Sequence, residues 1–172
     1  MRKVFSTLCL LAFSIPFCLS AQSSSMGWRM ATPSELRSVI PARAPVGSER
    51  IETEMRSASG VTDGKGKFIA GVVMITAGYS ADGKYSHFFL SQVPLKINAF
   101  TLRPGQYAIG WRRDGDMLAV SFYEAATGKL MGTVNAKRDV SSRVSSFRIT
   151  PPGDNPQMFI GRFAFGYHVM PN

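Results

Sequence analysis

The chain has few side chains suited to acid–base or metal chemistry, and its two histidines are the first to consider. His87 lies in the run 85–89 and His168 in the run 166–169, both of which predict strands. Two such strands could bring the histidines together with an acid to bind a metal ion. No His-x-His or His-x₃-His spacing is present, so we expect two separate strand histidines, no metal site and no cofactor.

Other catalytic and phosphate-binding patterns are incomplete. Residues 78–83 are similar to a nucleophile elbow around Ser80, but Asp82 stands where that motif needs glycine, and a strand follows instead of a helix. Asp114 and Asp116 are similar to the start of a calcium loop that lacks its glycine and distal glutamate. The glycine- and lysine-containing runs 64–67 and 126–130 lack the phosphate-loop frame and predict turns. We therefore expect no catalysis, with a small secreted hydrolase whose residues come from several strands as the alternative.

One basic and aromatic group of residues is the candidate ligand-binding patch. Trp111, Arg112 and Arg113 follow one another at the end of a predicted strand, and Tyr123 lies nearby in sequence. Aromatic rings on a sheet face with interspersed cations can stack on sugars or nucleobases. In the competing interpretation the aromatic rings fill the core while the cations reach the solvent at its rim.

The first residues of the chain have the pattern of a secretory signal peptide. Arg2 and Lys3 precede an apolar run from Val4 to Leu19, and small residues follow it. We expect cleavage near residues 20–22, which makes 1–21 the signal peptide. An uncleaved membrane anchor is the first alternative, but Pro16 interrupts the run. A lipoprotein is the second, but the residues before Cys18 do not suit acylation.

Export restricts the environment and the partners of the mature chain. Both cysteines lie inside the signal peptide, so disulfides are excluded as a source of stability. The net charge is +9, and without Arg2 and Lys3 there remain 18 basic against 11 acidic side chains, which gives +7. This excess favours acidic partners such as an envelope polymer, or it serves solubility alone. We expect a periplasmic or extracellular protein, for which another exported protein is a further candidate partner and nucleic acid is disfavoured.

Residues 22–48 form the expected lead-in to the domain. After a flexible stretch over 22–31, Thr32, Pro33 and Glu35 provide a cap hydroxyl, a first-turn proline and an acid at the third helical position. This capping box predicts a short helix over 33–40. Pro41 ends the helix, and residues 42–48 predict an extended linker.

From residue 49 to residue 172 the pattern is that of a single all-β domain. Short apolar or alternating runs are separated by turn residues, notably Asp-Gly at 63–64, 82–83 and 114–115 and Thr-Gly at 127–128. The strands that follow the second and third Asp-Gly turns are expected to pair with the strands before them. The predicted strands cover 49–57, 67–77, 85–92, 95–102, 106–113, 117–125, 130–137, 144–149 and 158–169.

Alternation along these strands predicts which faces are buried. Tyr107, Ile109 and Trp111 share one face of their strand, as do the apolar residues 118, 120 and 122 of the next. The runs 68–77 and 159–169 are apolar on both faces and predict central strands. Pro94 and a phase shift between Ile97 and Phe100 predict an edge or a bulge.

Residues Leu102-Arg103-Pro104-Gly105-Gln106-Tyr107 resemble the turn that enters a strand in secreted bacterial sandwich modules similar to transthyretin and carboxypeptidase-regulatory domains. The run is also similar to a tyrosine corner, in which a phenol bonds back to the backbone. The resemblance covers six residues and implies a sandwich without implying an activity. We therefore expect an antiparallel β-sandwich, Ig-like or transthyretin-like, or a partly closed barrel, acting as a non-catalytic binding or structural module of the bacterial envelope or exterior.

Overall fold

The structure is a computed structural model that describes residues 27–141 and 143–171. The expected signal peptide and its cleavage site lie outside the described residues. The described chain is mostly antiparallel β-structure with one short helix, which confirms the all-β expectation. The elements are β1 (Arg29–Met30), α1 (Pro33–Val39), β2 (Arg43–Val46), β3 (Glu49–Thr62), β4 (Phe68–Met74), β5 (His87–Ser91), β6 (Leu95–Ile97), β7 (Phe100–Leu102), β8 (Gly105–Asp114), β9 (Met117–Glu124), β10 (Leu130–Arg138), β11 (Ser145–Ile149), β12 (Gln157–Gly161), β13 (Phe163–Gly166) and β14 (His168–Val169).

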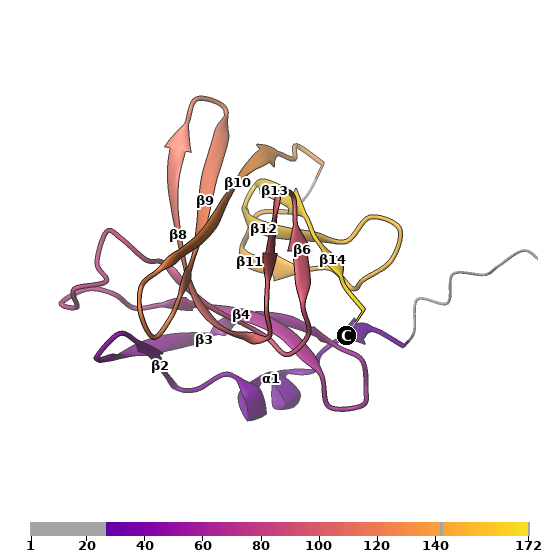
Figure 1. Ribbon diagram of the computed structural model, residues 1–172, viewed down its shortest axis with the longest axis horizontal. Coiled ribbons are helices and arrows are strands. Elements are labelled where there is room, and N and C mark those ends of the chain that lie inside the picture. Colours follow the sequence, from indigo (N-terminus) through magenta and orange to yellow (C-terminus); the bar gives the residue numbers. More distant parts are fainter. Residues whose placement is uncertain (1–26, 142, 172) are drawn as a thin grey trace, which may run out of the picture.

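Eleven strands form one curled sheet, and three short strands form a second sheet beside it (Figure 1). The order of the large sheet is β1-β3-β4-β5-β8-β9-β10-β13-β12-β11, with β2 paired to β3, and the small sheet has the order β14-β6-β7. The curl brings β11 against β3 and β4. There the Ile149 amide donates a hydrogen bond to Ser59 Oγ at 3.0 Å, so a serine hydroxyl links the last strand of the order to an early one.

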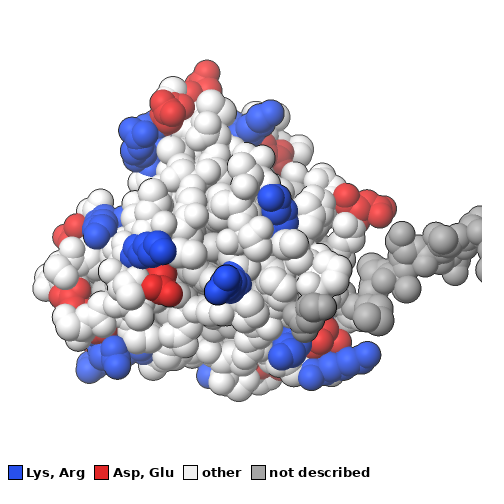
Figure 2. Space-filling view, viewed as in Figure 1, with Lys and Arg blue, Asp and Glu red and all other residues white. Residues whose placement is uncertain are grey.

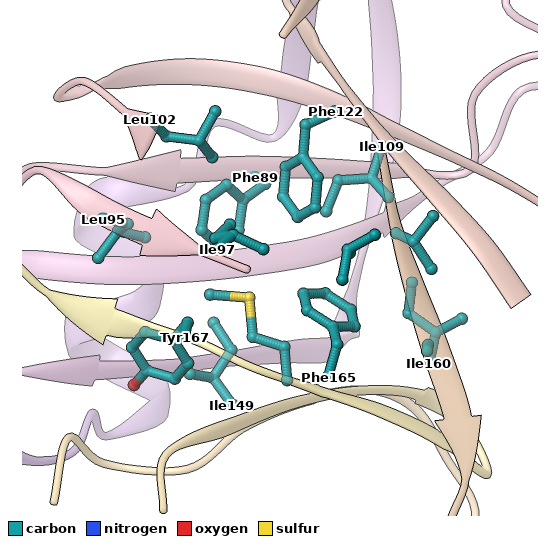
Figure 3. Close-up of a cluster of buried hydrophobic side chains, with 14 of the residues drawn as sticks. Phe89, Leu95, Ile97, Leu102, Ile109, Phe122, Ile149, Ile160, Phe165 and Tyr167 are labelled. Atoms are coloured by element: carbon teal, nitrogen blue, oxygen red, sulfur yellow. The ribbon is translucent and has the colours of Figure 1, made fainter. Parts of the chain in front are cut away.

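The curl gives the large sheet two buried faces. The buried apolar side chains on the concave face form what we call the inner cluster. In it, rings from β5, β9 and β13 meet side chains of the small sheet (Figure 3). Phe122 is its centre, because its ring contacts those of Phe89, Phe100 and Phe165. The outer cluster lies on the opposite face of β3, β4, β5 and β8, and α1 covers part of it through Leu36.

The helix of the N-terminal part forms as predicted, but Arg29–Met30, in a stretch expected to be flexible, pairs with β3 as β1. The Thr32 hydroxyl accepts a hydrogen bond from the Glu35 amide, and the Glu35 carboxylate accepts one from the Thr32 amide, which confirms the capping box. Arg29 pairs with that carboxylate and, with the Thr32 amide, lowers the pKa of Glu35 to about 2. Among the described residues no helix has the length and apolar character needed to cross a lipid bilayer. Residues 43–46, expected to lie in an extended linker, are extended and pair with β3 as β2.

The turn signals are confirmed where they predicted hairpins. β5 pairs with β4, β9 pairs with β8 and β10 pairs with β9, each in antiparallel register. Gly64, Gly83, Gly115 and Gly128 all have positive φ, as these turns require. The tyrosine-corner contact is also present, because the Tyr107 hydroxyl donates to the Arg103 carbonyl at 2.6 Å.

Two of the predicted strands are wrong as single strands. The run 95–102 is a hairpin of β6 and β7, because Asn98 takes a φ of 47° and reverses the chain where we expected an edge or a bulge. The run 158–169 is divided into β12, β13 and β14, because Gly161 has a φ of 63° and turns β12 back onto β13. Apolar residues on both sides of each break hid these turns from pattern reading. The small sheet forms because the chain reverses at Asn98 and because the chain leaves β13 after Gly166, so that β14 pairs with β6.

Candidate functional site

A pocket of about 700 Å³ opens at one end of the large sheet. It lies where β4 and β8 end and where β5, β9 and β11 begin, since antiparallel pairing places these strand ends side by side. We call this the Trp111 end; in Figure 1 it is the end toward which the β8–β9 hairpin projects. The apolar wall contains Val73, Met74, Trp111, Leu118, Ile160 and Phe163. The volume is within the range of roughly 300–1,000 Å³ that holds small organic ligands.

Trp111 and Arg113 lie on the inner face of β8, in line with Ile109 of the inner cluster. Trp111 is 47% exposed, so its indole lines the pocket instead of filling the core. The Arg113 guanidinium lies 4.9 Å from the centre of the Phe163 ring, and its Nε donates to the Gly115 carbonyl at 2.8 Å. An aromatic surface and a held cation therefore stand together at the pocket mouth.

His87 is the buried polar part of the pocket wall, with 4% of its surface exposed. Its Nε2 lies 3.2 Å from the Ser146 carbonyl, which can only accept, so Nε2 carries the proton of the neutral ring. Nδ1 therefore accepts the hydrogen bond that Ser86 Oγ donates at 2.8 Å. Burial lowers the pKa of His87 to about 4, which keeps the ring neutral near pH 7.

The other two residues of the predicted patch lie on the opposite face of the sheet. Arg112 alternates with Trp111 and Arg113 along β8, and Tyr123 pairs in register with Ala108 of the outer cluster. The Tyr123 ring contacts that of Tyr85 at 5.1 Å between centroids, with the Lys84 ammonium over both rings. The structure therefore brings Trp111 and Arg113 together in the pocket and separates them from Arg112 and Tyr123.

The remaining candidates of the sequence fall in separate places. His168 is exposed in β14 and lines a different groove from the pocket that contains His87. No group of three metal-ligating side chains occurs among residues 27–141 and 143–171. Ser80 donates to Glu49 from a polar turn, and Asp63 accepts backbone hydrogen bonds within its own turn.

The pattern of the sequence missed the polar partners of His87. Ser86 is adjacent in the chain, but the Ser146 carbonyl comes from β11, 59 residues further on. That contact depends on the curl that brings β11 to β3 and β4, and no local pattern encodes it. The contact of Phe163 with Arg113 was not predicted either, because Phe163 lies in the run 158–169, which was predicted to be one central strand.

Comparisons with known proteins give no relative. No protein-family model matches the chain, and no curated protein or solved structure matches it either. Function has therefore to be inferred from the pocket and its surroundings.

Proposed function

We propose that the protein is an exported, non-catalytic binding module of the bacterial envelope or exterior, and that its ligand occupies the Trp111 pocket. The observation that carries this proposal is the half-exposed Trp111 indole beside the Arg113 guanidinium at the mouth of an apolar hollow. An exposed tryptophan at a concave site is typical of ligand contact, since an indole left in water without a partner gains nothing from its apolar area.

The lining indicates an amphipathic organic anion, with an apolar acyl or aromatic body and one acidic group. Most of the wall is apolar, and no described lining residue is Asp, Glu, Asn or Gln. Sugar sites need such planar polar groups to pair with hydroxyls, so a carbohydrate fits this wall poorly. Arg113 supplies the cation that an acidic group requires, and it can bond a carboxylate or a phosphate through two parallel N–H groups.

An acidic polymer held by the whole surface has less support. On the face in Figure 2, Lys and Arg form separate patches divided by uncharged surface. A long polyanion binds best along a continuous basic track, whereas a small anion needs one well-placed cation. If the protein instead bound an acidic polymer, its retention on envelope polysaccharide should fall steeply as the salt concentration rises.

Titration with dodecanoate tests the proposal, with the uncharged dodecanol as the matched probe. We expect dodecanoate to change Trp111 fluorescence in a Trp28→Phe background, and Arg113→Ala to weaken its binding by about tenfold, as expected for a charge-assisted hydrogen bond. Arg112→Ala is the control, because it removes the same charge from the adjacent residue on the opposite face. Equal losses from both substitutions, or equal affinity for dodecanol, would contradict an assigned role for Arg113.

The curl of the sheet supports the finer description that we propose for the fold, a partly closed barrel in preference to a two-sheet sandwich. In a sandwich the two halves of the core face each other as separate sheets, whereas here hydrogen-bonded neighbours run continuously from β1 to β11. The link between Ile149 and Ser59 lies where the two ends of that order approach.

A hydrolase is the second candidate, and the Ser86–His87 pair is the observation that favours it. Ser86 Oγ is in hydrogen-bond distance of a neutral imidazole inside the pocket, as a serine nucleophile requires. Two features disfavour it: the imidazole is a weak base with a pKa of about 4, and its Nε2 is held by a carbonyl instead of a carboxylate. A panel of ester, peptide and glycoside substrates tests it, because turnover that disappears in Ser86→Ala without loss of folding would replace the binding proposal.

A further inference from the structure

We propose that the Trp111 end docks on an anionic lipid surface and that the pocket receives its ligand there. This inference deepens the proposed function and rests on it for the identity of the ligand. The docking surface itself is formed by residues around the pocket mouth, which can be tested separately from the pocket.

Exposed apolar side chains gather at this end of the molecule. The described residues expose seven large apolar side chains, and four of them belong to the Trp111 end: Ile75 at 50%, Trp111 at 47%, Val140 at 86% and Val144 at 54%. Single exposed apolar side chains are normal on a protein surface, whereas four gathered at one end indicate contact with an apolar phase or partner.

Of these four side chains Trp111 lines the pocket, and Val140 lines the neighbouring groove that contains His168. Val73 pairs with His87, which pairs with Ile109. Ile75 directly follows β4, and Trp111 lies on the inner face of β8, so the two flank the start of β5. Val140 and Val144 lie in the connection from β10 to β11, and β11 begins at the pocket wall. The four therefore lie in or next to the strand ends and connections of the Trp111 end, with Trp111 itself in the pocket wall.

Cations are interspersed with the apolar residues at this end. The connections that follow β8, β10 and β12, with the strand ends next to them, carry six basic side chains against three acidic ones. The basic side chains, all exposed, are Arg112, Arg113, Lys137, Arg138, Arg143 and Arg162, and the acidic ones are Asp114, Asp116 and Asp139. The connection from β4 to β5 adds Asp82 and Lys84 and leaves the excess unchanged. The excess of three positive charges is complementary to an anionic surface.

The arrangement suits a lipid surface better than a protein partner. A stable protein interface needs a continuous apolar centre with few charges, but here separate apolar side chains share the strand ends and connections with exposed Lys and Arg. Such side chains can enter the boundary between headgroups and acyl chains while neighbouring cations contact anionic headgroups, and tryptophan is favoured at that depth. An amphipathic anion would then pass from the lipid to the pocket without crossing water.

Fluorescence quenching at Trp111 tests the docking directly. The chain has two tryptophans, so full-length Trp28→Phe leaves Trp111 as the single indole. We expect vesicles of brominated phosphatidylglycerol and phosphatidylcholine to quench it, and vesicles of brominated phosphatidylcholine alone to quench it far less. Because the readout is the indole itself, attachment of any other part of the chain to the vesicles does not imitate docking.

Matched variants separate this surface from the rest of the molecule. We expect Arg138→Ala to weaken the quenching affinity about fivefold, which is the usual effect of one cation at an anionic surface, and Val140→Ser with Val144→Ser to weaken it at least as much. Lys129→Ala and Leu130→Ser are the controls, because Lys129 lies in the β9–β10 connection, Leu130 begins β10, and both are exposed at the opposite end of β9.

Each outcome distinguishes the docking from the ligand. Absence of quenching with anionic vesicles, equal quenching by neutral ones, or equal losses in the controls would overturn the docking proposal. Quenching by anionic vesicles without dodecanoate binding in free solution would support the docking surface and contradict the proposed ligand. Dodecanoate binding without quenching by vesicles would support the ligand pocket and contradict the docking proposal.

Discussion

The two faces of β8 end differently, although they are built from alternate residues of one strand. On the outer face the 79–85 connection crosses the strand, and the Lys84 carbonyl lies directly over Gly110. On the inner face the next residue, Trp111, has no such cover and remains half exposed beside a pocket. Gly110 therefore lets the 79–85 connection cover the outer face at the end of β8. The inner face at the same strand end stays open and forms the binding site.

The same contrast holds for the two clusters. The outer cluster is covered by α1 and by the 79–85 connection, so its side chains are enclosed along the strands. The inner cluster is enclosed by the curl itself and opens at the Trp111 pocket, where Leu118, Ile160 and Phe163 belong to both. Stability should accordingly depend on the closed parts of both faces, and binding on the open part of one.

The largest expected effect is at the centre of the inner cluster. Phe122 is fully buried and meets Phe89 and Phe165 edge to face, so Phe122→Ala should cost about 3–5 kcal/mol of the free energy of unfolding. Urea unfolding measures it. Phe68→Ala is the control, since Phe68 is only partly buried at the edge of the outer cluster. If both substitutions lowered the free energy of unfolding equally, the centre of the inner cluster would contribute no more to stability than the edge of the outer cluster.

His87, buried in the pocket wall, makes the stability of the fold sensitive to pH. Burial lowers the pKa of His87 to about 4 in the folded chain, below its ordinary value of about 6.5, so protonation favours the unfolded chain. The contribution is complete above pH 6.5 and is lost as the pH falls from about 6.5 toward 4, by about 3 kcal/mol in total. Urea unfolding at a series of pH values measures this loss.

Two substitutions separate His87 from the other acid-sensitive groups. His87→Gln removes the titrating ring and should flatten the unfolding free energy between pH 6.5 and 4, relative to the parent chain. His168→Gln is the matched control, because His168 is exposed in β14. A parent chain that keeps its full stability at pH 4 would show that water reaches the His87 ring.

Gly110 tests what closes the outer face. A methyl group added at this position would meet the Lys84 carbonyl, which is backbone and cannot rotate away, so Gly110→Ala should cost about 1–3 kcal/mol. Gly105→Ala on the same strand is the matched control, because the nearest atom to its added methyl group is Tyr107 Oη at 3.4 Å. Thermal unfolding of both variants measures the difference, and a neutral Gly110→Ala would mean that the connection adjusts freely.

Local chemistry predicted much of this fold. The Asp114-Gly115 turn predicted the pairing of β8 with β9, the Thr32–Glu35 box predicted α1, and alternation predicted that Tyr107 and Ile109 are buried. Each of these depends on residues close in the chain. The curl is different, because the Ile149–Ser59 hydrogen bond joins residues 90 positions apart and arises only when the whole sheet has formed.

The candidate site also has one part that the sequence predicts and one part that depends on the curl. The period of two along a strand places Arg112 on the face opposite Trp111, so alternation alone is enough to divide the predicted patch. The pairing of Arg113 with Phe163 could not be predicted, because it crosses from β8 to β13 through the curl. For the same reason the polar partners of His87 were not predictable from the order of residues.

Trp111→Ala should have the smallest effect on stability and the largest on binding. A core tryptophan would cost about 3–5 kcal/mol when truncated, but Trp111 is half exposed and lies beyond the inner cluster, so we expect less than about 1 kcal/mol. The variant lacks the indole, so dodecanoate binding has to be measured by calorimetry. We expect the free energy of binding to decrease far more than the free energy of unfolding does. A large loss of stability would instead place Trp111 in the closed core and make both faces of β8 alike.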